Sequence, residues 1–300
     1  MFLRRIMQRE TLQIMAKKDL GRTIIDELRL CYTAEPSLLD ELATIELGES
    51  KNYGDFLLFR VVSRHFQYAF DVLHYSSFDN NTKVATLRYG HYGSQVHSTY
   101  VYYRIENEVL YSQEKMITIL TLPDMLGMFF NHITSIDLAR DYKFNVVQRI
   151  RKIAKDDAIK VIVNGKAIDK EKDVAEGMFV FSLNFKKLSN PTIAVKQAKA
   201  VKDKTKGLTL FGYNKNKEIE TASHKSYIKD FYGNPQSLHR LEIHQNNEEI
   251  KDFCKSNVIA QDVNLIFNQD FLDNMYDAHL SSLLRFTKGR TKLEWREILH

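Results

Sequence analysis

The sequence predicts an α+β fold in which a central antiparallel β-sheet is flanked by helices. Three observations support this prediction. Residues 66–122 form successive short β-prone runs separated by turn residues, a pattern typical of an antiparallel meander. Apolar residues recur at helical spacing towards both ends of the chain. A chain of 300 residues is also long enough to bury a sizeable core, in one large domain or two ordinary ones.

The N-terminal part predicts helices followed by a strand. Residues 5–50 include RETLQIMAKK and LGRTIIDELRLC, whose apolar residues fall at helical intervals. PSLLDELATIEL begins with a proline, which is favoured in the first turn of a helix. YGDFLLFRVV, at 53–62, is strongly β-prone because it is rich in aromatic and β-branched residues.

The meander at 66–122 is expected to consist of strands joined by turns. Within it, IENEVLY resembles a tight hairpin, and the following residues 122–133 predict a helix. The predicted strands are FQYAFDVLHY, KVATLRYG, STYVYYRIEN, EVLYSQ and MITILTL.

The second half mixes strands and helices. TSIDLARDY (134–142) and LHRLEIHQ (238–245) predict strands, and a β-rich insert at 159–195 precedes another strand in GLTLFGYN. NVVQRIRKIAKDD (145–157) predicts an amphipathic helix with a basic face. Further helices are predicted for SHKSYIKDFYG, NQDFLDNMYDAHLSSLLRFTKG and TKLEWREIL. The chain then divides into an N-terminal helical segment, an α+β domain and a C-terminal helical segment, at 1–52, 53–253 and 254–300.

Composition limits the class of protein. Hydrophobic residues make up 44% and charged residues 27%, which is normal for a soluble globular protein. No apolar stretch reaches about 18 residues, and charges interrupt every apolar run of the N-terminus, so we expect neither a membrane span nor a signal peptide. Cys31 and Cys254 stand far apart without metal-type spacing, which favours free thiols in a reducing compartment. The sequence therefore predicts a cytoplasmic protein.

A run of lysines indicates more about a possible polyanionic partner than the net charge does. The net charge of +5 by itself indicates a polyanionic partner only weakly. VKQAKAVKDKTKG, at 195–207, holds five lysines and one aspartate. Two interpretations stay open, a solvated loop or lysines that contact phosphate groups. The lysines are Lys196, Lys199, Lys202, Lys204 and Lys206.

Three of the predicted strands share a polar face, because alternate side chains of a strand point to opposite sides of a sheet. On the other face of each strand the residues are aliphatic or glycine. The polar-face residues are Asp137, Ala139 and Asp141 in SIDLARD, Arg240, Glu242 and His244 in HRLEIH, and Thr209, Phe211 and Tyr213 in LTLFGY. If the strands are neighbours, Asp137, Glu242, His244 and Tyr213 gather on one face.

This set of side chains predicts chemistry on a phosphate. Two carboxylates and an imidazole suit a hard divalent cation such as Mg²⁺ or Mn²⁺. A tyrosine beside such an ion indicates an attack by the phenol that forms a covalent phosphotyrosine. A free tyrosine has a pKa of about 10, so positive charge from Lys215 or from the metal is expected to favour the phenolate. Glu218 or His244 is the expected proton acceptor.

Two further interpretations concern the same strands. Gly212 is expected to leave room for the backbone of a nucleic acid to approach Tyr213 closely. The alternative to a catalytic site is the ordinary polar surface of a half-exposed sheet, with simple cross-strand ion pairs around Tyr213.

The motifs SIDLARD, GYNKNKE and HRLEIHQ, in this order, resemble those of the replication initiators of filamentous phages and of related rolling-circle plasmids. Ile136-Asp137 corresponds to the first motif. Tyr213, Lys215 and Glu218 correspond to the second, and Arg240 and Glu242 to the third. The resemblance covers roughly residues 84–253, including YRIENEVLYS and VNGKAID. The sequence lacks the pair of histidines around a hydrophobic residue that binds metal in many rolling-circle initiators.

The resemblance implies a rolling-circle initiator-like fold and a metal-dependent DNA endonuclease, with 53–253 as the nicking domain. Members of this family nick an origin at one site, stay joined to the 5′ phosphate through a tyrosine and later rejoin the strand. Tyr213 occupies the position of that nucleophile, and Lys215 and Arg240 are expected to stabilise phosphate charge. Asp137 and Glu242 are expected to hold Mg²⁺ or Mn²⁺, with Asp141 or His244 as a further ligand.

The partner implied by the resemblance is origin DNA, either single-stranded or a melted duplex. A host helicase and a single-strand-binding protein are expected as further partners. The lysines of 196–206 are expected to follow the DNA backbone, together with Arg149 and Lys152 on the basic face of the 145–157 helix. The rival prediction is a non-catalytic DNA-binding regulator of a plasmid or phage origin, which needs neither Asp137 nor Tyr213.

Overall fold

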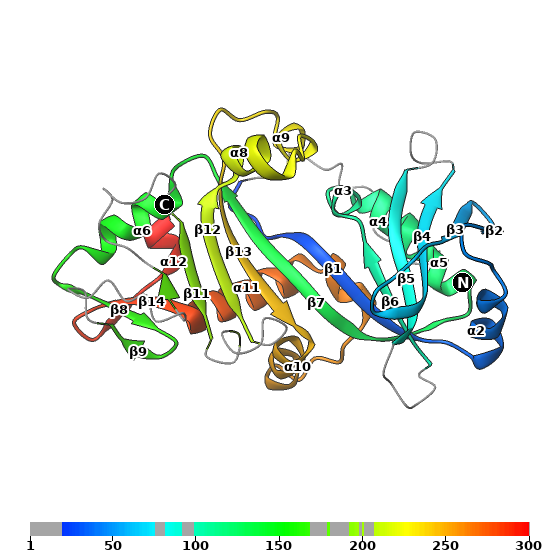
Figure 1. Ribbon diagram of the computed structural model, residues 1–300. Coiled ribbons are helices and arrows are strands. Elements are labelled where there is room, and N and C mark those ends of the chain that lie inside the picture. The colour runs from blue at the N-terminus through cyan, green and yellow to red at the C-terminus, as the bar shows by residue number, and fades with distance from the viewer. Residues whose placement is uncertain are drawn as a thin grey trace. The chain divides into compact units, whose positions relative to one another are not determined.

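The computed structural model describes residues 20–75, 82–91, 99–168, 179–180, 192–197, 200 and 207–299 (Figure 1). The chain forms two compact units. The first comprises the described parts of Asp26–Ile136 and Ala260–Phe267, and the second those of Met15–Ile25, Asp137–Ile259 and Asn268–His300. The predicted α+β class, with a large antiparallel sheet and flanking helices, is confirmed. Among the described residues, no helix is both long and apolar enough to cross a membrane.

The first unit is built on a meander of antiparallel strands. The order of its strands is β7-β1-β6-β5-β4-β3-β2. Their bounds are β1 (Ile24–Thr33), β2 (Ser50–Tyr53), β3 (Phe56–Arg60), β4 (Phe66–His74), β5 (Lys83–His91), β6 (Tyr100–Ile105) and β7 (Phe129–Tyr142). The helices of this unit are α2 (Pro36–Ala43), α3 (Asn107–Leu110), α4 (Gln113–Ile119) and α5 (Thr121–Met125), followed much later in the chain by the 3₁₀ helix η3 (Val263–Phe267). Its core contains the fully buried side chains of Leu28, Phe56, Phe70, Leu87 and Tyr103.

The predicted helix that includes 24–33 is wrong, because this segment is strand β1. In DELRLC the buried Leu28 and Leu30 alternate with Glu27 and Arg29, so the segment satisfies a period of two as well as helical spacing. Antiparallel pairing with β6 decides the outcome, since it satisfies the backbone hydrogen bonds of both strands.

The predicted strands EVLYSQ and MITILTL are also wrong, because these residues form α3, α4 and α5. The hydroxyl of Ser112 accepts a hydrogen bond from the backbone N–H of Lys115, which caps α4. This cap was a sequence signal for a helix start, with Glu114 in the first turn. The helix predicted for 122–133 ends at Met125, and β7 begins at Phe129.

The second unit contains two sheets. Its larger sheet has the order β10-β11-β12-β13-β7, and its smaller sheet the order β15-β14-β8-β9. The strands are β8 (Ile159–Val163), β9 (Lys166–Ala167), β10 (Phe179–Val180), β11 (Ile193–Lys196), β12 (Thr209–Asn214), β13 (His239–Asn246), β14 (Leu284–Lys288) and β15 (Thr291–Leu293). The helices are α6 (Val146–Ala154), α8 (Lys215–Glu218), the π-helix η2 (Ile219–Ser223), α9 (Tyr227–Phe231), α10 (Asn247–Ser256), α11 (Gln269–Leu283) and α12 (Trp295–Leu299).

The predicted C-terminal helices are confirmed only in part. Helix α11 ends at Leu283, and the residues after it form strand β14 instead of continuing the helix. Leu284 and Phe286 are buried while Arg285 between them is exposed, which is the alternation of a strand. Strand β14 pairs with β8, a strand more than a hundred residues earlier, and such a distant partner cannot be read from the local pattern.

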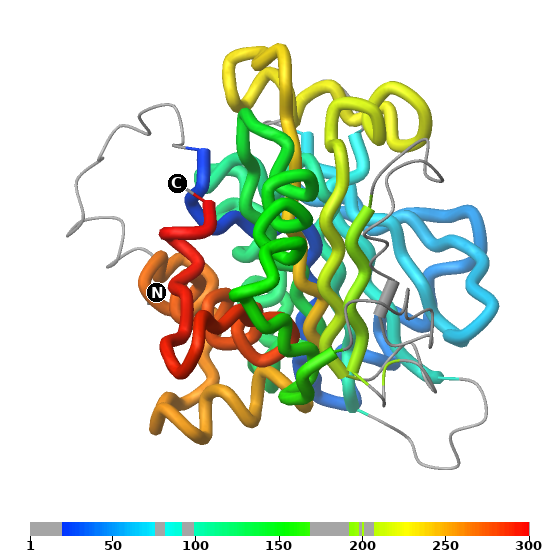
Figure 2. The backbone as a smooth tube through the Cα atoms, turned by 90° about the vertical axis from the view of Figure 1, so that its left-hand side faces the viewer, coloured from blue at the N-terminus to red at the C-terminus, as the bar shows by residue number. Residues whose placement is uncertain are grey.

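Helices cover one face of the larger sheet in the second unit. Tyr276 of α11 donates a hydrogen bond from its hydroxyl to the backbone carbonyl of Leu241, 3.2 Å away. Helix α6 packs against β12 on the same side as Leu241 (Figures 1 and 2). We call this side the core face. The other side is the polar face, which carries Lys196, Phe211, Tyr213, Glu242, His244 and Asp137.

The expectation that Gly212 opens a path for DNA is wrong, because Gly212 lies on the core face. A Cβ atom at this position would come within 2.9 Å of Leu241 Cδ2 and within 3.4 Å of Val147 Cγ2 in α6. The glycine therefore allows the helix to pack closely on the strand. Its missing side chain serves the core and leaves the polar face unaffected.

We expect Gly212→Ala to lower the free energy of unfolding by about 1–3 kcal/mol, because an added methyl group overpacks a dense contact. The side chain of Leu241 must move, and Ile193 Cβ, 3.4 Å from the new methyl, belongs to a neighbouring strand and yields less easily. Urea unfolding of the purified protein measures this difference. An unchanged midpoint with an unchanged slope would contradict the packing role.

Candidate active site

The register of three strands arranges the polar face in rows. Residues directly opposite each other on antiparallel strands point to the same side of the sheet. Tyr213 of β12 pairs with Arg240 of β13 in one row. In the next row Phe211 pairs with Glu242 and, on its other side, with Ala194 of β11. In the third row Thr209 pairs with His244 and with Lys196, so the predicted shared face of β12 and β13 is present.

The hydroxyl of Tyr213 is held by a carboxylate. It donates a hydrogen bond to Glu242 Oε2 over 2.8 Å, and the tyrosine side chain is half-buried. The sequence predicts Glu218 or His244 as the proton acceptor and Glu242 as a metal ligand. The structure places Glu242 itself on the hydroxyl, because a residue one row away on the neighbouring strand is within reach of a long side chain.

A buried cation lies beside the tyrosine ring. Strand β12 ends at Asn214, whose side chain accepts a hydrogen bond from the backbone N–H of Lys217 and so caps the short helix α8. This turn brings Lys215 Nζ to 5.6 Å from the centre of the Tyr213 ring. The side chain of Lys215 is only 3% exposed and pairs with Glu218 Oε2 at 2.9 Å. Glu218 thus lies on the Lys215 side of the site and balances the charge of the lysine.

His244 and Asp137 form a second polar pair on the same face. His244 Nδ1 lies 2.5 Å from Asp137 Oδ1, which fixes the orientation of the imidazole ring. Both side chains keep some contact with solvent, at 27% for His244 and 13% for Asp137. The two residues therefore form an oriented and accessible acid–imidazole pair on neighbouring strands.

Asp141 and Arg240, in contrast, are enclosed. Arg240 donates two hydrogen bonds to the Asp141 carboxylate, at 2.8 and 2.7 Å, and both side chains are 0% exposed. Arg240 Nη1 also lies 3.7 Å from Glu242 Oε2, the oxygen that accepts the hydrogen bond of Tyr213. The structure therefore does not support Asp141 as a metal ligand or Arg240 as a phosphate contact. The alternation along a strand indicates the face of a residue but not how deeply that residue is covered.

The predicted metal ligands can bind one ion only if their donor atoms lie close together. Among the described residues, no group of three or more histidine, cysteine, aspartate or glutamate side chains is gathered as a metal site. The chemistry of Asp137, His244 and Glu242 nevertheless suits a hard divalent cation, and the first two are already adjacent and accessible. Asp141 drops out of the candidate set because Arg240 uses both of its carboxylate oxygens.

The predicted DNA-binding residues fall into three groups. Lys196 lies on the polar face, in the row that contains His244. Arg149 and Lys152 belong to α6, which packs on the core face, and Arg149 stacks its guanidinium 5.0 Å above the ring of Phe144. These two residues are therefore not brought together with Tyr213. Lys199, Lys202, Lys204 and Lys206 lie outside the described residues.

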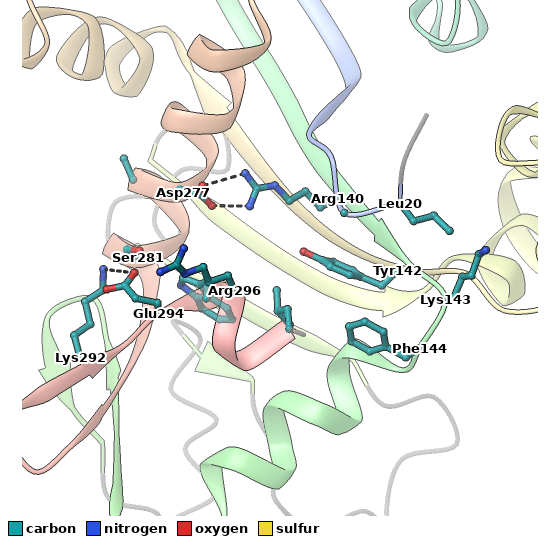
Figure 3. A pocket seen from close by; sticks show the side chains of 14 residues that line it. Leu20, Arg140, Tyr142, Lys143, Phe144, Asp277, Ser281, Lys292, Glu294 and Arg296 are labelled. Atoms are coloured by element: carbon teal, nitrogen blue, oxygen red, sulfur yellow. Dashed lines mark hydrogen bonds and ion pairs between the residues drawn. The ribbon is translucent and has the colours of Figure 1, made fainter. Parts of the chain in front are cut away.

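A cavity of about 770 Å³ opens on the reverse side of β7 (Figure 3). Its wall includes Arg140 and Tyr142, which alternate along β7 with the polar-face residues. Arg140 is neutralised there by Asp277, at 2.6 Å, and burial raises the pKa of Tyr142 well above its usual range. None of the predicted catalytic or metal-binding residues lines this cavity. The candidate site is therefore on the polar face.

No protein-family model matches the sequence, and no curated protein matches it significantly. Among solved structures, the protein TBP of Methanococcus jannaschii is similar over 84% of this chain and 99% of its own, with 9% identity and a TM-score of 0.26. The rolling circle replication initiator protein of Geobacillus stearothermophilus is similar over 89% of both chains, with 11% identity and a TM-score of 0.43. Both similarities are weak, so the proposal below rests on the residues of this chain.

Proposed function

We propose that this protein is a rolling-circle replication initiator that nicks and rejoins a DNA strand through a covalent bond between Tyr213 and the 5′ phosphate. One observation carries the proposal. The Tyr213 hydroxyl is hydrogen-bonded to Glu242 beside the buried Lys215, on the sheet face that also bears the Asp137–His244 pair. The order of the three sequence motifs supports the same assignment.

The contacts of Tyr213 provide both halves of nucleophile activation. Glu242 Oε2 accepts the hydroxyl proton, since it already accepts the hydrogen bond from that hydroxyl. The Lys215 ammonium near the ring favours the negative charge of the phenolate that results. Asp141, through Arg240, holds the Glu242 carboxylate in place.

The transfer of the phosphoryl group then needs no reagent other than the DNA, Tyr213 and water. The phenolate oxygen attacks phosphorus, a new P–O bond to Tyr213 forms, and the bond to the 3′ oxygen breaks in line with it. Solvent protonates the departing 3′ oxygen, which leaves a free 3′ hydroxyl. The reverse attack by a 3′ hydroxyl on the phosphotyrosine releases Tyr213 and rejoins the strand.

Mg²⁺ or Mn²⁺ would be held by Asp137 and His244, whose side chains are adjacent and accessible. When bound there, the ion neutralises charge on the non-bridging phosphate oxygens. Lys196 would contact the next phosphate along the strand, because it lies in the His244 row of the same face. All of these residues belong to the second unit.

The test uses a random-sequence pool of single-stranded oligonucleotides labelled at the 3′ end. The pool as a whole contains short nicking sites of every sequence, and the label stays on the fragment joined to the protein. After incubation with Mn²⁺, a denaturing gel is expected to show a labelled species that migrates more slowly than the free protein. Binding of the DNA without any such adduct, with either Mg²⁺ or Mn²⁺, would favour the non-catalytic DNA-binding regulator and overturn the proposal.

Asp137→Asn is expected to reduce nicking by about 10–100-fold, because it removes the charge that orients His244 and binds the cation. Binding of single-stranded DNA is expected to persist, since phosphate contacts elsewhere supply most of the affinity. A matched control is Glu220→Gln, because the Glu220 carboxylate is 62% exposed and pairs with Lys229 at the surface of the same unit. Nicking by Asp137→Asn at the wild-type rate with Mn²⁺, or nicking by the wild type in buffer freed of metal by a chelator, would contradict this assignment.

A further inference from the structure

Phe211 is an exposed aromatic residue in the middle of the polar face. Its side chain is 36% exposed, although it is flanked along β12 by Thr209 and Tyr213 and faces Glu242 across the sheet. The neighbour on the other side, Ala194, has a small side chain. Within the described part of the chain, Phe211 makes no aromatic or cation–π contact.

Packing does not explain this phenylalanine. The core of the second unit is supplied by the opposite face of the same strand, where Leu210 is fully buried and Gly212 receives α6. A solvent-facing position of an antiparallel strand is ordinarily polar. A single exposed apolar side chain is common by itself. In β12, however, the exposed ring of Phe211 lies next to the proposed nucleophile, Tyr213, on the same face.

The position of the ring matches what a nucleotide beside the scissile phosphate needs. Residues two apart on a strand lie about 6–7 Å apart and point the same way. A DNA strand that runs along β12 from a phosphate at Tyr213 would carry its neighbouring base across Phe211, with Lys196 and His244 one row further on. An exposed aromatic ring offers that base a stacking surface.

We propose that Phe211 is a stacking subsite for an unpaired base of single-stranded DNA, next to the phosphate that Tyr213 attacks. The inference rests on the proposed function and adds to it a contact for the base next to the scissile phosphate. A base inside a duplex already has both of its faces stacked, so it cannot stack on Phe211 without leaving the helix. The subsite accepts any base, because every base presents a π-face.

The test is carried out in the Tyr213→Phe background, where no bond can be cleaved, so binding is measured apart from chemistry. Fluorescence anisotropy follows the binding of a random-sequence single strand, a duplex of the same length and a single strand of abasic sites. Phe211→Ala and Phe211→Leu remove the ring, and Phe211→Trp keeps an aromatic surface. The matched control is Phe59→Ala on β3, since Phe59 is 37% exposed and lies in the first unit.

Loss of the ring is expected to weaken binding of the single strand by about ten- to one-hundred-fold. Phe211→Trp is expected to bind about as well as the parent, and the control to be unaffected. All variants are expected to bind the abasic strand equally, since it has no base to stack. Equal binding of the base-containing strand by Phe211→Leu and the parent, or an equal loss in Phe59→Ala, would overturn the subsite.

The outcome separates this inference from the function on which it rests. A ring-dependent preference for the single strand, without any covalent adduct in the wild-type protein, supports the subsite and overturns the nicking function. An adduct with no dependence on Phe211 does the reverse. Absence of any binding to single-stranded DNA overturns both. Matching unfolding midpoints for all variants exclude loss of folding as the cause.

Discussion

Tyr213→Phe is expected to abolish both nicking and the covalent protein–DNA adduct. The change removes one oxygen atom and keeps the ring, so the contact of Lys215 with the ring and the packing of β12 persist. The hydrogen bond to Glu242 is lost, but the Glu242 carboxylate keeps its position beside Arg240. Folding and the affinity for single-stranded DNA are therefore expected to stay close to those of the wild type. Gel assays for the adduct and anisotropy for binding measure the two properties separately.

Two neighbouring tyrosines provide the controls for this experiment. Tyr227 begins α9 and Tyr232 follows it, on the segment between β12 and β13. Tyr227→Phe and Tyr232→Phe are expected to form the adduct as the wild type does. An adduct that survives in Tyr213→Phe and disappears in one of these variants would move the nucleophile to that residue.

Breaking the buried pair between Asp141 and Arg240 is expected to have the largest effect on stability. Asp141→Leu or Arg240→Met leaves one charge enclosed without its partner, which costs about 3–5 kcal/mol of unfolding free energy. The double variant Asp141→Leu/Arg240→Met removes both charges and is expected to recover most of that loss. Urea unfolding of the wild type, the two single variants and the double variant gives the coupling energy between the two side chains.

This cycle also decides between two roles for Arg240. A loss of stability in both single variants, relieved in the double variant, is the result expected of a structural pair that positions Glu242. If Arg240→Met unfolds like the wild type but binds DNA more weakly, Arg240 contacts phosphate, as the sequence motif implied, and its structural role is wrong.

The sequence predicts which side chains of each active-site strand share a face. It does not predict how deeply each side chain is buried or which residues it contacts. Period-two alternation is a local property, and it placed Tyr213, Glu242 and His244 on one face, as the register of β12 and β13 does. The burial of Asp141 and Arg240 depends on what covers them, which no single strand records. The same limit explains the wrong prediction for Gly212, whose role depends on Val147 in a different element.

Two kinds of error in secondary structure have different causes. The residues of β1 are expected to form a helix because IIDELRLC fits both periods, and only pairing with a distant strand resolves the choice. The residues of α4 are expected to form a strand, although Ser112 and Glu114 are a capping signal that favours a helix. The first error needed tertiary information, whereas the second did not.

The most direct test of the proposed mechanism identifies the residue that holds the DNA. After trapping with a random single strand and Mn²⁺, nuclease and protease digestion leave one peptide that carries a nucleotide remnant, and tandem mass spectrometry locates that remnant. We predict a phosphodiester on Tyr213, in the peptide that contains GLTLFGYNK. A remnant on Tyr227, Tyr232 or any other residue, or an adduct that forms unchanged in Tyr213→Phe, would contradict the mechanism.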